Sequence, residues 1–271
     1  MPWLLTTFHT SATSIGCFIL MGTGHLTLTS LTTRENLTLV AFSFLFTLNI
    51  AISNVSLAMV SVPFHQIMRS TCPVVTIAIM RTIYGKTYDT ATYLSLIPLI
   101  LGVGLATAGD YQASLLGVLL TALGVLLACI KTIATNRLMT GSLKLPPTEV
   151  LLRMSPLAAL QCMLYATVTG EVTRFRDSYA AGNLPISLGI AFLLNATMAF
   201  ALNVVSFQTN KMIGAVAVTV CGNVKQALTI MLGIVFFSVP VGIMNAAGMA
   251  VTMVGAAWYS KIELDRKKAS S

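Results

Sequence analysis

Nine apolar runs of about 20 residues constrain the fold of this chain more than any other feature of its sequence. They lie at 3–24, 36–58, 60–84, 91–110, 113–135, 148–170, 186–206, 213–237 and 240–261. Each can cross a hydrocarbon layer about 30 Å thick as a helix, and each is too long and too continuous for a barrel strand. Only 9% of the residues are charged, whereas a soluble domain usually has about 25%. We therefore expect an all-α, polytopic transmembrane helical bundle that forms a single domain over residues 1–271.

The same composition excludes several other classes of protein. No polar stretch exceeds about 15 residues, so none can bury a core of its own. The net charge of +8 comes from cations scattered over short loops, which does not fit a nucleic-acid-binding surface. No GxSxG, HExxH or paired-carboxylate motif is present, so we expect no enzyme, metal site or cofactor. The five cysteines lie in apolar runs without disulfide spacing, which predicts buried thiols: Cys17, Cys72, Cys129, Cys162 and Cys221.

The lysines and arginines predict the orientation of the chain, because cytosolic loops are enriched in them. With the C-terminal tail KIELDRKKASS in the cytosol, eleven cations share that side and only Arg174 and Arg176 lie on the other. The cytosolic set is Arg34, Arg81, Lys86, Arg137, Lys144, Arg153, Lys211, Lys261, Arg266, Lys267 and Lys268. We therefore expect a cytosolic C-terminus.

Nine spans and a cytosolic C-terminus put the N-terminus on the far side, although no signal peptide precedes the first run. We expect that one helix is missing upstream of Met1. The alternative is a wrongly divided span at the 84–91 or 110–113 junction. In this orientation the triplet at Asn36 is cytosolic and those at Asn54 and Asn195 lie inside spans, so we expect none of them to be glycosylated.

Two segments of the chain resemble each other. SNVSLAMVSVPFHQIMRSTCPVVTIAI begins at Ser53, and LNVVSFQTNKMIGAVAVTVCGNVKQALTIML begins at Leu202. Each has an Asn-Val pair near the end of one helix, then a turn, then a helix with a cation near its middle. The two units enter this helix from opposite sides of the membrane, which is typical of inverted-repeat transporters. We expect an incomplete first repeat at 1–110 and a second repeat at 113–271.

Two cations lie near the middle of predicted spans. Arg69 is about 14 Å deep in the span 60–84, and Lys225 is about 18 Å deep in the span 213–237. An unpaired cation at this depth costs at least about 2.5–3.5 kcal/mol. All eight acidic residues fall in loops or at helix ends, so no fixed carboxylate neutralises the two cations. We interpret them as the binding site of a mobile anion, in the first place a phosphate group.

Other interpretations of the intramembrane cations stay open. Lys131 is four residues from the cytosolic end of its span, where snorkelling to the surface is the better explanation. The alternative for Arg69 is to bind backbone carbonyls of a broken helix, because Pro73 would free the carbonyl of Arg69. The lack of a buried carboxylate favours anion exchange over a proton- or sodium-driven mechanism, although His65 and His9 are able to carry a proton.

Polar residues cluster around these cations in the sequence. Gln66 lies one turn before Arg69, and Gln226 directly follows Lys225. Asn and Gln inside membranes also hold helices together, so each has a structural alternative, as does His65. The candidate substrate-binding residues are Ser53, Asn54, His65, Gln66, Arg69, Lys131, Asn203, Asn223, Lys225 and Gln226.

Several stretches resemble the triose-phosphate transporter branch of the drug/metabolite transporter superfamily. They are SVPFHQIMRSTCPV, YLSLIPLILGVGLATAGDY, GNVKQALTIMLGIVFFSVPVGIMNAAGM and GAAWYSKIE. PWLLTTFHTSATSIG is similar to the start of that family's second helix. The branch includes plastid sugar-phosphate antiporters and Golgi and endoplasmic-reticulum nucleotide-sugar transporters. The resemblance covers essentially the whole chain and implies a ten-helix inverted-repeat bundle with alternating access and strict exchange.

The resemblance also implies roles for individual residues. In the plastid members a lysine in the fourth family helix and a Lys-Arg pair in the ninth hold the phosphate. Arg69 matches the first position and Lys225 the second, while Gln226 replaces the arginine of the pair. This departure weakens the case for a small sugar phosphate. The Phe-Tyr-Asn-Asn and Gly-Ala-Leu-Asn-Lys motifs of the GDP-mannose transporters are absent, so the substrate stays open and a nucleotide sugar in the secretory pathway is favoured.

The sequence as a whole predicts a membrane antiporter that exchanges a nucleotide sugar or sugar phosphate for a phosphate-bearing counter-substrate. A drug or amine exporter of the same superfamily is one alternative, but a cationic substrate favours a buried Asp or Glu. A non-transporting or truncated membrane protein of the same fold is another. The small-residue stripe Gly248, Thr252 and Ala256 is expected to pack within the monomer, and a homodimer stays open.

Overall fold

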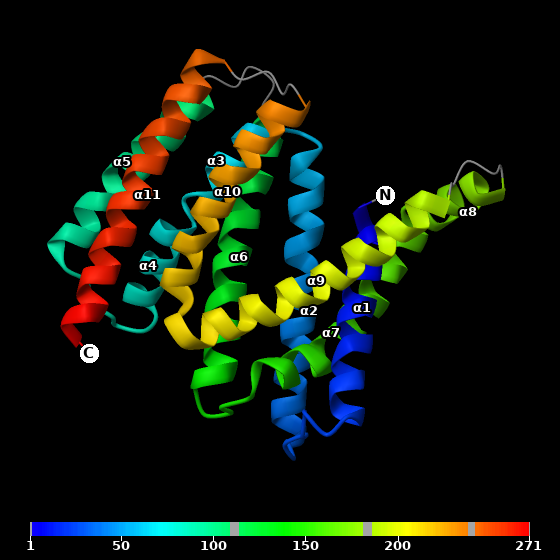
Figure 1. Ribbon diagram of the computed structural model, residues 1–271. Helices are drawn as coiled ribbons and strands as arrows, with labels where there is room; N and C mark the ends of the chain where they lie inside the picture. Colours follow the sequence, from blue (N-terminus) through cyan, green and yellow to red (C-terminus); the bar gives the residue numbers. More distant parts are fainter. Residues whose placement is uncertain (1, 109–113, 181–185, 238–241, 271) are drawn as a thin grey trace. The chain divides into compact units, whose positions relative to one another are not determined.

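The computed structural model describes residues 2–108, 114–180, 186–237 and 242–270, and every regular element in these ranges is an α-helix (Figure 1). Five helices, α1, α2, α6, α7 and α9, are long and apolar enough to cross a membrane, by length and composition. The expected polytopic all-α bundle is confirmed. In chain order the helices are α1 (Pro2–Gly22), α2 (Thr33–Leu57), α3 (Val62–Arg69), α4 (Cys72–Thr82), α5 (Thr90–Ala108), α6 (Leu115–Thr140), α7 (Pro147–Val168), α8 (Glu171–Ala180), α9 (Ile186–Ile213), α10 (Ala215–Phe237) and α11 (Ile243–Ser270).

Several predicted helix ends were wrong. The predicted span 60–84 is not one helix, since α3 ends at Arg69 and α4 begins at Cys72. The segment after 170, expected as a loop, forms α8. The helices α6, α9 and α11 run past the predicted ends at 135, 206 and 261. Apolar length reports where a helix crosses hydrocarbon, whereas a helix is free to continue into water with polar residues.

The chain divides into two compact units, each of which draws helices from both predicted repeats. The first unit holds residues 1–48 and 134–212, with α1, α7, α8, α9 and parts of α2 and α6. The second unit holds residues 49–133 and 213–271, with α3, α4, α5, α10, α11 and the remaining parts of α2 and α6. The repeat boundaries at 110 and 113 stay a prediction.

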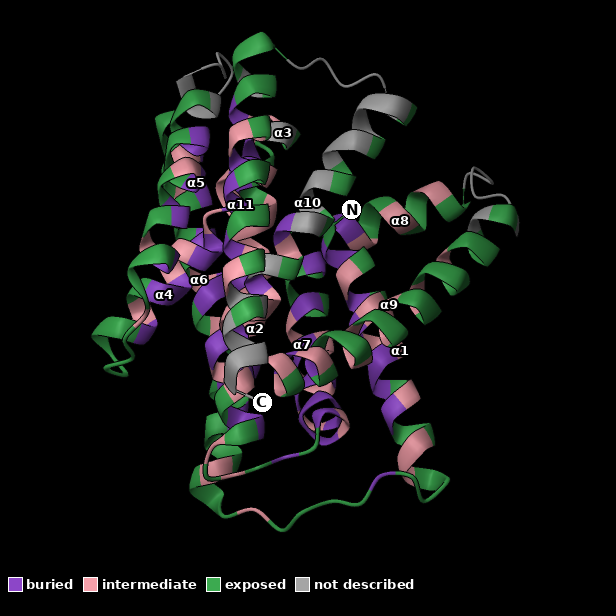
Figure 2. Cartoon of the chain, turned by 60° about the vertical axis from the view of Figure 1, so that its left-hand side comes forward, coloured by how far each residue is buried: buried purple, intermediate pink, exposed green. Residues whose placement is uncertain are grey.

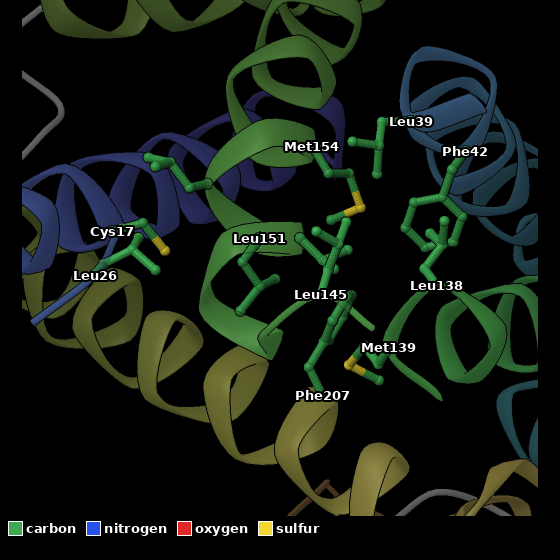
Figure 3. Close-up of a cluster of buried hydrophobic side chains, with 12 residues drawn as sticks. Cys17, Leu26, Leu39, Phe42, Leu138, Met139, Leu145, Leu151, Met154 and Phe207 are labelled. Atoms are coloured by element: carbon green, nitrogen blue, oxygen red, sulfur yellow. The ribbon is translucent and has the colours of Figure 1, made fainter. Parts of the chain in front are cut away.

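The core of the first unit surrounds α7. Figure 3 shows side chains of five helices that meet there, among them Cys17 of α1, Phe42 of α2, Met139 of α6, Leu151 of α7 and Phe207 of α9. All of them are buried. Because these helices are far apart in the sequence, the cluster fixes their packing within the unit.

In the second unit, α5 and α11 run side by side (Figure 1). The stripe Gly248, Thr252 and Ala256 of α11 is buried. A Cβ atom on Gly102 of α5 would lie 2.2 Å from Thr252 Oγ1 and 2.6 Å from the Gly248 carbonyl oxygen. The predicted packing of this stripe within the monomer is therefore confirmed. Figure 2 shows buried and exposed residues alternating along both helices, as expected for helices that pack on one side only.

All five cysteines are free thiols, which agrees with the absence of disulfide spacing. Four are buried, but Cys221 on α10 is exposed, so the expectation of a buried thiol was wrong there. An apolar transmembrane helix does not need to bury every small apolar residue, because lipid accepts them as readily as a protein core does.

Candidate anion-binding site

The site forms at the break between α3 and α4. Pro73, in the first turn of α4, has no N–H, and its ring excludes the carbonyl of Arg69 four residues earlier. The Ser70 N–H and hydroxyl both donate to the Gln66 carbonyl, at 3.1 and 3.2 Å, and the Thr71 hydroxyl donates to another carbonyl of the last turn. These bonds end α3 at Arg69. The guanidinium thus belongs to a helix C-terminus, where the partial negative charge of the helix stabilises a cation.

Three of the predicted site residues meet at one hydroxyl group. Arg69 Nη1 donates to Ser53 Oγ at 3.0 Å, and His65 Nε2 lies 3.4 Å from the same oxygen. Ser53 lies near the end of α2, whereas His65 and Arg69 are one turn apart on α3. The side chain of His65 is only 5% exposed. The hydroxyl therefore holds the guanidinium in place from a second helix.

Two lysines add positive charge to the same site. The charges of Arg69 and Lys225 both act electrostatically on Lys131, and the charge of Arg69 acts on Lys225. Lys131 precedes the end of α6 at Thr140 by nine residues, about 14 Å along the axis. The helix therefore continues past the apolar run that ends at 135, and snorkelling of Lys131 to the surface stays an alternative. Arg69, Lys131 and Lys225 thus lie within electrostatic range of one another, on α3, α6 and α10. Arg69 and Lys131 are half-buried and Lys225 is exposed. None of these three helices contains an Asp or Glu.

Several buried polar side-chain atoms of the second unit have no hydrogen-bond partner among the described residues. Three of them belong to predicted site residues: Asn54 Nδ2, His65 Nδ1 and Asn223 Oδ1. The other amide atom of Asn223, Nδ2, donates to the Ser70 carbonyl at 3.2 Å, which places this side chain at the helix break. Buried polar groups are nearly always paired in folded proteins. These three atoms are therefore available to a ligand or to water.

The remaining predicted site residues are not all part of this cluster. Gln66 lies one turn before Arg69 and is half-buried. The side chain of Gln226 lies outside the part of the chain that the structure describes. Asn203 belongs to the first unit, where its Nδ2 donates to Thr13 Oγ1 at 3.0 Å. The ring of His9 contacts the Asn195 amide in the same unit. The binding roles of these residues stay predictions.

The sequence reasoning missed two buried carboxylates in the first unit. Glu149 is completely buried, forms an ion pair with Arg153 at 2.8 Å and accepts two hydrogen bonds from Thr29 at 2.9 Å. Glu171 is 4% exposed and accepts a hydrogen bond from the Leu4 N–H in the first turn of α1. The four-residue spacing of Glu149 and Arg153 was the available signal. Both carboxylates lie at helix starts and already have partners, so neither is a ready counter-charge for a cationic substrate.

The candidate site is rich in hydrogen-bond donors and positive charge. One guanidinium, two ammonium groups and a hydroxyl come from four helices of one unit. Among the described residues, no group of three or more His, Cys, Asp or Glu side chains could hold a metal ion. The arrangement therefore offers binding and charge neutralisation.

Comparison with known proteins agrees with this chemistry. A probable sugar phosphate/phosphate translocator of Arabidopsis thaliana is 32% identical over 237 residues, which cover 85% of this chain and 64% of the relative. UDP-galactose transporter 1 of the same plant is 29% identical, over 81% of this chain and 65% of its own length. UDP-uronic acid transporter 1, also of Arabidopsis thaliana, is 26% identical, over 96% of this chain and 85% of its own length. The chain thus spans just under two thirds of the length of the first two relatives.

A solved crystal structure shares the fold, with a TM-score of 0.64 and 15% identity over 97% of this chain and 89% of that chain. The profile of the Triose-phosphate Transporter family matches residues 1–260. This family and its nucleotide-sugar relatives are transporters and not enzymes. The chain belongs to the triose-phosphate transporter family.

Proposed function

We propose that this chain is a membrane antiporter that exchanges a nucleotide sugar or sugar phosphate for a phosphate-bearing counter-substrate by alternating access. The observation that carries the proposal is the cluster of Arg69, Lys131 and Lys225 on helices without acidic residues. Cations at membrane depth mark substrate pathways when no fixed anion neutralises them. A phosphate group that enters and leaves would supply a negative charge that none of these helices carries.

Arginine and lysine side chains bind a phosphate in different ways. The guanidinium of Arg69 is planar and suits two parallel hydrogen bonds to phosphate oxygens, whereas each lysine acts as a point charge. Arg69 Nη1 donates a hydrogen bond to Ser53 Oγ at 3.0 Å, so the guanidinium is oriented before the ligand binds. A discontinuous helix such as α3–α4 is typical of substrate sites in transporters, where irregular backbone lines a cavity.

Exchange is favoured over ion-driven uptake. Proton and sodium carriers usually hold the driving ion with an Asp or Glu inside the membrane, and the cation-bearing helices contain none. An empty site of three cations is unfavourable, which favours return of the carrier with a second anion. We place the protein in a membrane of the secretory pathway with a cytosolic C-terminus, and we favour a nucleotide sugar because Gln226 follows Lys225.

The test is a thermal-shift screen of the purified chain in detergent, followed by counterflow in liposomes. The panel holds UDP-, GDP- and CMP-sugars, the matching nucleoside monophosphates, small sugar phosphates and inorganic phosphate. A ligand at 100 times its dissociation constant adds about 2.7 kcal/mol to the stability. We expect a shift with one nucleotide sugar and its monophosphate, and uptake of the labelled sugar only into liposomes loaded with the monophosphate.

The variants decide which residues carry this activity. The double variant Arg69→Ala/Lys225→Ala is expected to abolish both the shift and the counterflow. Lys86→Ala, which removes an exposed loop lysine of the same unit, is expected to leave both unchanged. Undiminished counterflow in the double variant contradicts the proposal, as does uptake that needs no internal anion.

A further inference from the structure

The helix break is held by two side chains from helices that are distant in the sequence. Asn223 Nδ2 on α10 donates to the Ser70 carbonyl at 3.2 Å. The Cys129 thiol on α6 lies 3.4 Å from the Cys72 carbonyl and donates to it. Asn223 is 5% exposed and Cys129 is completely buried. The Ser70 carbonyl follows the end of α3, where the last carbonyls of a helix lack intrahelical partners, and lipid offers no hydrogen-bond donor. The Cys72 carbonyl belongs to the first turn of α4, so the thiol attaches the start of α4 to α6.

Each of these two helices also carries one of the site's cations. Lys131 follows Cys129 by two residues on α6, and Lys225 follows Asn223 by two residues on α10. Arg69 is the last residue of α3, directly before the break. The two hydrogen bonds therefore join the three cation-bearing helices at one level of the unit. If either bond is lost, the helix that made it is free to slide or turn relative to the break.

We infer that Asn223 and Cys129 are positioning residues, which set the spacing of Arg69, Lys131 and Lys225 through the carbonyls of the break. This inference rests on the proposed anion site and gives Asn223 a different role from the direct substrate contact that the sequence predicted. A misplacement of about 1 Å at a charged site is enough to weaken it strongly. The amide of Asn223 acts through the backbone of Ser70, and the thiol of Cys129 acts through that of Cys72.

The experiment compares four variants of the full chain in detergent. Asn223→Ala and Cys129→Ala remove the two donors, whereas Cys129→Ser keeps a donor at the same place. Asn49→Ala is the matched control, because Asn49 is also a buried amide of the second unit that donates to a carbonyl, that of Gly124 on regular helix α6, at 2.9 Å. Hydrogen exchange reports the backbone amides of residues 70–76, and a ligand titration by thermal shift reports the dissociation constant of inorganic phosphate or of the strongest nucleotide sugar.

We expect Asn223→Ala and Cys129→Ala to speed exchange at 70–76 and to raise the dissociation constant about tenfold. Cys129→Ser is expected to restore both values, and Asn49→Ala is expected to lower the melting temperature without changing either. Unchanged exchange at 70–76 overturns the inference, and so does faster exchange with unchanged affinity. If the wild-type chain binds no anion, the proposed function fails, while the exchange measurement still decides whether the two donors hold the break.

Discussion

At the scale of single residues, Lys131 adds a third positive charge within electrostatic range of Arg69 and Lys225. Arg69 and Lys131 are half-buried and Lys225 is exposed, and repulsion between like charges grows as water screens it less. The empty site therefore carries an electrostatic cost that a bound anion relieves. A residue that only supported the fold would not link stability and anion binding in this way.

This cost predicts opposite effects of one substitution on stability and on binding. Lys131→Met keeps most of the apolar stem and removes the charge, so we expect a higher melting temperature without ligand and a dissociation constant raised about tenfold. Lys131→Arg keeps the charge, and we expect it to retain affinity within about threefold. Melting curves over a series of ligand concentrations measure both quantities, with Lys86→Met as the surface control. A Met variant that is less stable and binds as tightly as the wild type would show that Lys131 is structural.

At the scale of helices, the close packing of α5 against α11 predicts that a glycine-to-alanine substitution on α5 destabilises the protein at one position and not at another. A Cβ atom on Gly102 would meet Thr252 Oγ1 and the Gly248 carbonyl, at 2.2 and 2.6 Å, whereas one on Gly104 would meet nothing within 4 Å. Gly102→Ala forces the helices apart, so we expect a loss of about 1–3 kcal/mol and a lower melting temperature. Gly104→Ala, on the same helix, is expected to be neutral or slightly stabilising. Equal melting temperatures for the two variants would contradict this close packing.

The apolar runs predicted where most helices lie. They failed where a helix is polar, or where contacts between residues distant in the sequence determine a helix end. The helix α8 has a polar sequence around Arg174, so no apolar run marks it. Pro73 indicated a disturbance after Arg69, but a proline can kink a helix or end it. Here the carbonyls at the break find donors on Cys129 and Asn223, 57 and 153 residues away from them in sequence. No local pattern specifies such partners.

The candidate site was predictable to the extent that charge alone identifies it. Arg69 and Lys225 stand out because a cation inside an apolar run is costly. Lys131 was assigned to the surface because the apolar run stops at 135, and the charges that act on it belong to Arg69 and Lys225, which are distant in the sequence. The donor Cys129 has no signal at all, since a buried thiol in an apolar helix looks like any other small apolar residue.

At the scale of the whole molecule, two compact units share α2 and α6, and eight of the ten predicted site residues have described side chains in the second unit. Gln226 belongs to the same unit by sequence, and Asn203 belongs to the first. Most of the proposed anion site therefore lies within one unit, on α2, α3, α6 and α10. This predicts that changes within the second unit alter affinity, as in the variants of Lys131 and Asn223.

The orientation that we propose for the whole chain is testable with two glycosylation triplets. Eleven lysines and arginines against two predict that Asn36 is cytosolic and that the segment around Arg176 lies on the far side. Arg176→Asn creates the triplet Asn-Asp177-Ser178 there, and it removes one far-side cation, which strengthens the charge asymmetry. Expressed through the endoplasmic reticulum, this variant is expected to gain a glycan that a glycosidase removes, whereas the wild-type chain, with its native triplet at Asn36, is expected to run unchanged before and after digestion. Asn36 is also engaged in the fold, because its side-chain oxygen accepts a hydrogen bond from Arg153 at 3.3 Å. A glycan on Asn36 and none on the new triplet would reverse the topology, and with it the side from which each half of the site opens.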